Sequence, residues 1–175
     1  ESFGNINPDQ TVVRTNAFSC NVANNIPDQH IVLLNLSSTN GTDTWPSHFN
    51  ITANSPVLSI GAMTVQDNGP GCNNDGILDP GETANLVIAN SNTGHSGITN
   101  VAGSLSIVGG LSPYLTINSV TSSLGALAIG GSGNTIFNVT ASLSTPIGTP
   151  VNLGYILTGG VAGQYSVTAS KQVVI

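Results

Sequence analysis

The chain has 175 residues, of which 39% are hydrophobic, so it has ample material for a buried core. Only 6% are charged, against roughly 25% in ordinary soluble domains, which leaves a Thr, Ser, Asn and Gly surface typical of secreted β-proteins and extracellular fibre subunits. The net charge is -6 and the only cations are Arg14 and Lys171, which argues against binding to nucleic acid or to anionic membranes. No apolar run has membrane-spanning length, which argues against membrane insertion.

The first 54 residues contain short apolar runs separated by turn signals. They predict β-strands at residues 18–22, 30–36 and 48–52. Alternation in the first run places Cys20 on an inward strand face, whereas Cys72 lies in a later acidic loop. Because the cysteine count is even, a Cys20–Cys72 disulfide is one alternative, and a buried small side chain with a separate loop thiol is the other. Trp45 is expected to fill a core or hinge position.

Ser55 and Pro56 predict a hinge, after which the strand pattern restarts. Candidate strands follow at residues 57–66, 82–90, 98–108, 114–120, 133–142, 150–158 and 164–174. No segment has a convincing helical period. Seven short strands at this spacing predict an all-β, immunoglobulin-like β-sandwich over residues 55–175.

An internal repeat links the two parts of the chain. Residues 18–36 align without gaps on residues 137–155, and Phe3-Gly4 matches Leu124-Gly125 after a two-residue adjustment. The matched pairs include Phe18 with Phe137, Pro27 with Pro146, Val32 with Val151 and Leu34 with Leu153. The repeat predicts a tandem array in which residues 1–54 are the second half of one module and residues 55–175 are a complete one. A half-sandwich leaves an apolar face and strand edges that the missing half or a neighbouring molecule must cover.

The most distinctive stretch is the loop 67–82, DNGPGCNNDGILDPGE, which contains four of the eight acidic residues. Laid over a twelve-residue calcium loop that begins at Gly71, it puts Gly76 at the sharp turn and Leu78 at the apolar anchor. Gly71 stands where an Asp is expected, and Asp67 is predicted to replace it. The predicted calcium ligands are Asp67, Asn73, Asp75, the backbone carbonyl of Ile77, Asp79 and Glu82. The alternative is an acidic turn that is merely solvated.

No helical pattern flanks the loop, so we expect it between two β-strands rather than in an EF-hand. Catalytic patterns find little support, because His30, His48 and His95 are scattered and none is predicted to have a partnered carboxylate. The Gly-rich run at 130–133 follows no βαβ pattern and predicts a turn between strands. We therefore expect the chain not to be an enzyme.

Several runs together resemble a known family of modules: residues 18–22, 26–28, 44–45, 49–58 (FNITANSPVL), Asp67 and 74–86 (NDGILDPGETANL). The resemblance is to the immunoglobulin-like and CARDB-like modules of large secreted Bacteroidetes proteins. Such modules accompany gingipain-type (family C25) peptidases and other cargo of the type IX secretion system. The resemblance implies an accessory β-sandwich outside the cell or on its surface, and it identifies a type of module rather than a reaction.

These features predict a non-catalytic structural or adhesion-type segment of a larger secreted or cell-surface protein, with calcium in loop 67–82 limiting bending near Ser55-Pro56. The expected partners are neighbouring immunoglobulin-like modules of the same chain or identical subunits. One alternative is a self-assembling extracellular filament or surface-layer subunit, suggested by the low-charge surface and the unfinished half-module. Another is an accessory domain of a secreted gingipain-like peptidase.

Overall fold

The structure is a computed structural model that describes residues 1–109 and 112–175. In these residues every regular element except one 3-10 turn is a β-strand, which confirms the all-β prediction. The strands are β1 (His30–Thr39), β2 (Thr44–Ala53), β3 (Leu58–Gln66), β4 (Thr83–Asn92), β5 (Ile98–Ile107), β6 (Leu115–Ile117), β7 (Thr121–Leu127), β8 (Ser132–Ala141), β9 (Pro150–Gly159) and β10 (Tyr165–Val174), with the 3-10 turn η1 at Val161–Gly163.

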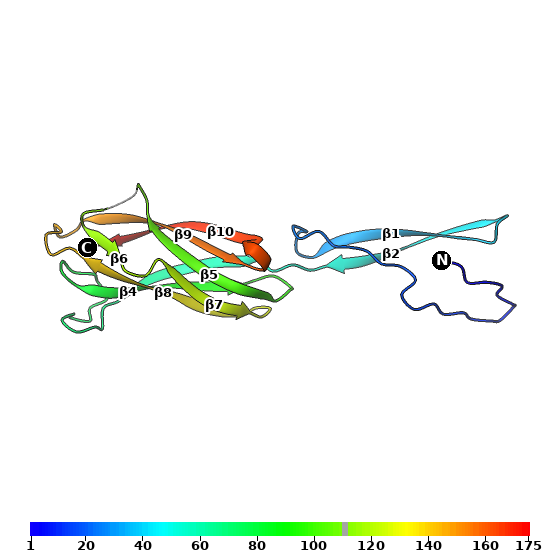
Figure 1. The fold of residues 1–175 in the computed structure, drawn as a ribbon, viewed down its shortest axis with the longest axis horizontal. Coiled ribbons are helices and arrows are strands. Elements are labelled where there is room, and N and C mark those ends of the chain that lie inside the picture. The colour runs from blue at the N-terminus through cyan, green and yellow to red at the C-terminus, as the bar shows by residue number, and fades with distance from the viewer. Residues whose placement is uncertain (110–111) are drawn as a thin grey trace.

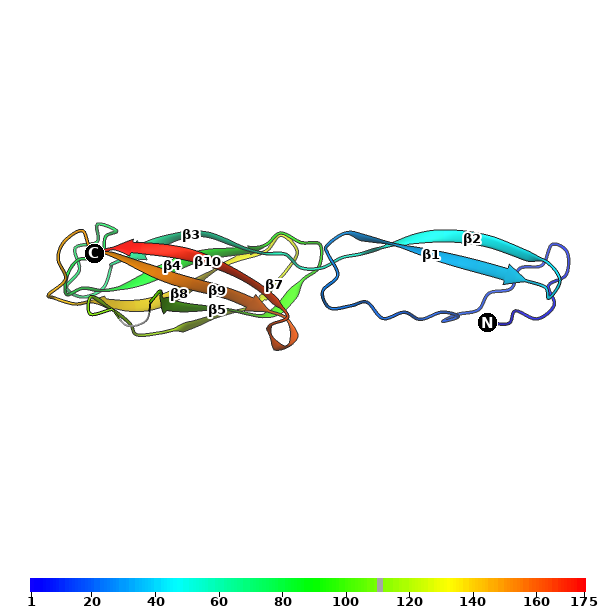
Figure 2. The same cartoon turned by 90° about the horizontal axis from the view of Figure 1, so that it is seen from above.

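Two β-structures lie end to end along the long axis of the molecule (Figures 1 and 2). β1 and β2 form an antiparallel hairpin of their own, while the other strands form two four-stranded sheets in the orders β10-β9-β5-β7 and β3-β4-β8-β6. The two sheets pack face to face, so residues 55–175 form the expected β-sandwich. The strand order corresponds to the two sheets of immunoglobulin domains, with β7 added at the edge of the sheet that contains β9.

The core lies between the two sheets, where alternate residues of β4, β8 and β9 point inward. Its largest fully buried hydrophobic side chains are Tyr155, Phe137, Leu78, Leu86, Ile88, Leu153, Leu157, Val101 and Val139. Within this core the Tyr155 hydroxyl donates to Oδ1 of Asn90 (3.0 Å) and lies 2.9 Å from the Thr135 hydroxyl. Burial raises the pKa of Tyr155, so the phenol remains neutral and links β9 to β4 and β8.

The sandwich has eight strands in its described residues, one more than the sequence predicted. The extra strand, β7, was missed because its sequence, TSSLGAL, has little apolar alternation and a glycine in its interior. The predicted strand at 114–120 is also shortened to the three residues of β6. Both differences lie on the sheet edges, where fewer side chains are buried and the apolar pattern is weakest.

The junction between the hairpin and the sandwich, where we expected a hinge at Ser55-Pro56, is closely packed. Both of these residues are buried. The backbone N–H of Val57 donates to the side-chain oxygen of Asn92 (3.1 Å), and the N–H of Thr93 donates to the carbonyl of Val57 (2.8 Å). A Cβ atom on Gly94 would lie only 2.5 Å from the Val57 nitrogen, so the two backbones are in close contact.

Residues 1–29 form an irregular arm that runs beside the hairpin (Figure 2). The strand predicted at 18–22 is absent, and both Phe18 and Cys20 are exposed rather than inward-facing. Trp45 does not fill a core position either, because it lies in β2 with 54% of its surface exposed. These predictions were wrong for one reason: no second sheet packs over this part of the chain to bury the apolar side chains.

The arm nevertheless repeats the turns that connect β7, β8 and β9 in the sandwich. In the first pair of matching turns, the N–H of Gln10 donates to the carbonyl of Asn7 (3.1 Å), as the N–H of Gly131 donates to that of Ala128 (2.9 Å). In the second pair, the N–H of Ile26 donates to the carbonyl of Ala23 (3.2 Å), as the N–H of Thr145 donates to that of Ser142 (3.0 Å). Positive φ angles recur at the matched pairs Gly4 and Gly125, Asp9 and Gly130, and Gln29 and Gly148. The two-residue adjustment in the alignment falls where the arm has an additional turn, at Thr15 and Asn16.

Candidate metal site in the β3–β4 loop

The loop 67–82 connects the end of β3 to the start of β4, between two strands as predicted. β3 begins next to the junction and runs away from it for nine residues, or about 30 Å, so the loop lies at the opposite end of the sandwich. The C-terminus lies at this same end (Figures 1 and 2). The expectation that the loop limits bending at Ser55-Pro56 is therefore wrong, because the loop is too far away.

Two contacts anchor the loop to the sandwich, and one backbone conformation shapes its turn. Leu78 is fully buried in the core, as expected for the apolar anchor. Gly76 has a φ of +82°, a left-handed conformation that suits glycine at the predicted turn. Near the C-terminal end of the loop, the N–H of Gly81 donates to the carbonyl of Ala141 (3.2 Å), and the N–H of Ala141 donates to the carbonyl of Glu82 (2.9 Å). The last turn of the loop is thereby joined to the end of β8.

Asp67 is the most buried acidic residue, with only 1% of its surface exposed. One carboxylate oxygen accepts the backbone N–H of Asp75 (2.9 Å), and the other accepts that of Gly76 (3.1 Å). The Asp67 side chain therefore folds the tip of the loop back onto the end of β3. Each carboxylate oxygen also has a second lone pair, which leaves it able to bind a cation.

Glu82 has the same role at the other end of the loop. Its side chain is buried, and its two oxygens accept the backbone N–H groups of Asn73 (3.3 Å) and Asp79 (3.0 Å). Two buried carboxylates, one directly after β3 and one directly before β4, thus fix the path of the loop between them. Each is held by backbone dipoles and not by a basic side chain.

Asn73 lies between the remaining two acidic side chains. Its amide nitrogen donates to Oδ2 of Asp75 (3.1 Å) and to Oδ2 of Asp79 (2.9 Å). Because both oxygens contact one atom, they are at most about 6 Å apart, close to the roughly 5 Å that separates opposite oxygen ligands of calcium. The other oxygen of Asp75 accepts the N–H of Ile77 (2.9 Å), which orients the carboxylate.

In the part of the chain that the structure describes, no Lys or Arg side chain pairs with an acidic group of this loop. Lys171 donates to the carbonyl of Gly61 (2.6 Å), and the one contact between a basic and an acidic side chain in residues 1–109 and 112–175 joins His95 to Asp28. In the same residues, no three His, Cys, Asp or Glu side chains converge closely enough to hold a metal by themselves. Two of the six predicted ligands are not acidic side chains: the Asn73 side chain is an amide, and Ile77 offers its backbone carbonyl. The predicted site therefore combines carboxylate oxygens with these two neutral oxygens.

The two cysteines are separate free thiols, so the alternative without a disulfide is the one that the structure shows. Cys20 is exposed in the N-terminal arm, whereas Cys72 is half-buried in loop 67–82 with its sulfur 3.5 Å from the carbonyl of Thr83. The arm and the loop lie at opposite ends of the molecule (Figure 1), which explains why the two thiols do not meet.

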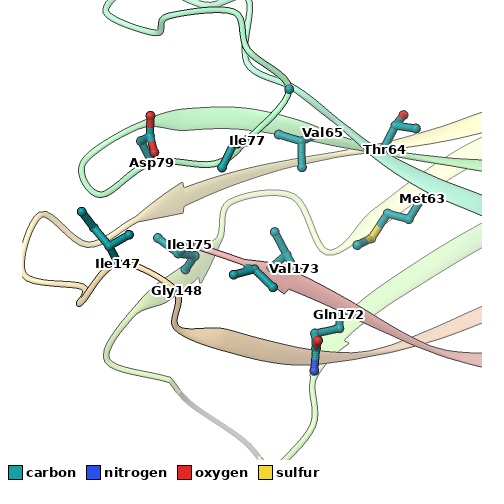
Figure 3. A pocket seen from close by; sticks show the side chains of 12 residues that line it. Met63, Thr64, Val65, Ile77, Asp79, Ile147, Gly148, Gln172, Val173 and Ile175 are labelled. Atoms are coloured by element: carbon teal, nitrogen blue, oxygen red, sulfur yellow. The ribbon is translucent and has the colours of Figure 1, made fainter.

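An open groove of about 750 Å³ lies beside the loop, where the edge strands β3 and β10 of the two sheets approach each other. Figure 3 shows Ile77, Ile147 and Ile175, from three different segments, around this space. Asp79 is the one charged residue among its described lining residues. The groove therefore lacks the converging polar groups that orient a small ligand.

The structure also reveals a contact that sequence analysis missed. Nδ1 of His95 lies 2.7 Å from Oδ2 of Asp28, and Oδ1 of Asp28 accepts the N–H of Ser55 (2.9 Å). The hydrogen bond with His95 holds the pKa of Asp28 below its ordinary value. No local pattern connects residues so far apart in the sequence. The contact links the arm to the β4–β5 connection and so belongs to the junction.

No family model matches the chain, and no curated protein matches it. In the described residues, no helix is long and apolar enough to span a membrane.

Proposed function

We propose that residues 55–175 are a non-catalytic, extracellular structural β-sandwich that binds calcium through loop 67–82, within a larger secreted or cell-surface protein. The observation that carries this proposal is the convergence of Asp75 and Asp79 on Asn73, in a loop whose two ends are fixed by the buried carboxylates of Asp67 and Glu82. An unpaired cluster of carboxylates is costly to hold together, and a divalent cation removes that cost.

The donor set suits a hard cation. Calcium binds six to eight oxygen ligands and tolerates irregular geometry. Four carboxylates, the carbonyl of Ile77 and the side-chain oxygen of Asn73 would provide these ligands, once the Asn73 amide turns its oxygen toward the acidic side chains. Because Asp67 follows β3 and Glu82 precedes β4, a shared ion would join the ends of both strands. The ion would thereby offset the conformational entropy lost in ordering the loop.

The proposed location is consistent with this chemistry. Calcium sites of extracellular modules have dissociation constants of about 10⁻⁴ to 10⁻³ M, and only abundant calcium fills such sites. The scarcity of charged residues and the resemblance to secreted Bacteroidetes modules support the same location. The proposal holds equally for a module of a filament subunit or one beside a secreted peptidase, because the ion acts within residues 55–175.

Thermal unfolding of the whole chain with and without calcium tests the proposal. For a dissociation constant near 10⁻⁴ M, 10 mM calcium stabilises the folded state by about 2.7 kcal/mol. This corresponds to a rise in Tm of about 10 °C over the value in a chelator. Magnesium at the same concentration should have a smaller effect, because it demands stricter octahedral geometry.

The variant Asp79→Asn should lose most of the calcium-dependent rise in Tm, since it removes one ligand charge while keeping the shape of the side chain. Asp9→Asn is the matched control, because it removes an acidic residue from an exposed turn of the arm, and it should keep the full rise. A Tm that is the same in calcium and in chelator, together with no heat of calcium binding by calorimetry, would exclude the calcium site.

A further inference from the structure

The hairpin β1–β2 has an apolar face whose counterpart on β9 is buried in the sandwich core. On β9, Val151 is 5% exposed, Leu153 0% and Tyr155 1%. The repeat aligns these residues with Val32, Leu34 and Leu36 of β1, all of which remain partly exposed. β2 contributes to the same face through residues that pair with β1 across the ladder. These residues are also uncovered, with Phe49 49% and Trp45 54% exposed.

The edges of the two hairpins differ in the same way. β9 pairs with β10 on one side and with β5 on the other, whereas β1 pairs with β2 alone among the described strands. The outer strands of both hairpins carry residues that discourage further pairing, Pro46 in β2 and Lys171 in β10. β1 is ten residues long and contains no proline, lysine or acidic residue, so its sequence is that of an interior strand.

The arm shows which strands are missing. Its turns match those around β7 and β8, but it contains neither strand. In the sandwich, β7 pairs with β5, while β8 pairs with β4 and β6. All of these partners belong to the segment β3–β6, which has no counterpart in residues 1–54. β1 and β2 do form a ladder. Their equivalents in the sandwich, β9 and β10, pair with each other, and both strands lie outside the segment β3–β6.

We propose that residues 1–54 bind a polypeptide segment with four strands equivalent to β3–β6, which completes a second sandwich. One incoming strand adds to the free edge of β1 as β5 adds to β9. In that register Leu105 lies opposite Tyr155 and Ile107 opposite Leu153, so the incoming strand places apolar residues opposite Leu36 and Leu34. A groove of about 1130 Å³ between the arm and the hairpin, partly lined by Phe3, Phe18 and Trp45, provides the entry for the incoming layer.

A second copy of the chain does not supply these strands. In the sandwich β4 pairs with both β3 and β8, and β5 pairs with both β7 and β9, so neither is free to leave. The N-terminal part of a second copy lacks the same four strands. Two copies joined edge to edge through β1 would leave the apolar face open, and two hairpins packed face to face would leave the edge of β1 without a partner. The proposal does not depend on calcium binding, which concerns loop 67–82 alone.

The test uses the whole chain extended by a copy of residues 55–120 placed before Glu1 through a flexible linker. Hydrogen exchange is then measured at the amides of β1 and of residues 18–22. We expect exchange to slow on the order of 100-fold relative to the unextended chain, because these amides join new ladders. The matched control carries Ser106→Pro in the added copy only. The N–H of Val108, two residues further on, donates to Asn152 beside β9, so the N–H of Ser106 faces the same neighbour, and its removal should restore fast exchange.

The sandwich of residues 55–175 serves as an internal reference, and its exchange should be the same in all three chains. Unchanged fast exchange at β1 in the extended chain would overturn the proposal. So would a concentration-dependent dimer of the unextended chain that slows exchange at the same amides, because a second copy would then be the occupant. Calcium titration of the unextended chain is unaffected by either result, so the two proposals fail separately.

Discussion

Residues 1–54 and 122–175 contain the same succession of turns, yet only the second set of segments is built into a sandwich. A turn depends on a few neighbouring residues, so it forms wherever its local sequence occurs. A strand depends on a partner across the sheet and on a second layer over its apolar face. The comparison separates these two requirements within one chain: the arm retains the turns, and it lacks the strands whose partners are absent.

The largest expected effect comes from one substitution made at equivalent positions in the two parts. Leu153→Ala opens a cavity in the closed core and should lower the free energy of unfolding by about 3 kcal/mol. Leu34→Ala removes the same side chain from a face that is still partly in contact with water, so it should cost less than about 1 kcal/mol. Denaturant unfolding of both variants measures the difference. Equal costs would show that the hairpin face is already covered.

A smaller effect is expected at the junction, where the two parts meet. Gly94→Ala puts a Cβ atom against the backbone of Ser55 and Val57, which cannot move aside like a flexible side chain. We expect a cost of about 2 kcal/mol and faster hydrogen exchange at Val57 and Thr93. Gly97→Ala is the control, because its nearest neighbour, the carbonyl of Leu127, lies at an ordinary 3.7 Å. Equal exchange in the two variants would contradict a tightly packed junction.

The smallest effect concerns Asp28, whose pKa is lowered by its hydrogen bond with His95. A carboxylate with a lowered pKa contributes stability above its ordinary value of 3.8 and loses that contribution as pH falls through the folded-state pKa. Exchange of the Ser55 amide should therefore quicken in acid below that value, after correction for intrinsic rates. Asp28→Asn should quicken it several-fold at neutral pH, with little change in Tm. If the Ser55 amide exchanged at the same rate in Asp28→Asn, the Asp28–His95 contact would not help to hold the junction.

Much of the sandwich was predictable from sequence because its strands alternate regularly. β4, β8 and β9 each place apolar residues at several successive alternate positions, and the predicted bounds of these strands fall within a few residues of those observed. The loop was predictable for a similar reason, since its turn glycine and its buried leucine occupy fixed positions in a known pattern. Calcium binding itself stays a prediction.

The remaining features depend on contacts between distant segments. β7 forms through pairing with β5, although its own sequence carries little pattern. The residues 18–22 carry a strand pattern, yet they form no strand because their partners are absent. The Asp28–His95 contact and the position of loop 67–82 at the end of the sandwich opposite the junction both follow from topology. Sequence periodicity reports the local preference of a segment and not the presence of its partners.

The directions of β3 and β10 have a mechanical consequence. β3 leaves the junction, and β10 ends beside the C-terminus at the opposite end of the sandwich (Figure 2). A pull applied between the junction and Ile175 would therefore act along the strands and not across them. The ladder bonds of β3 with β4 and of β10 with β9 would resist such a load together instead of breaking one at a time. This geometry would let the sandwich transmit tension along its length.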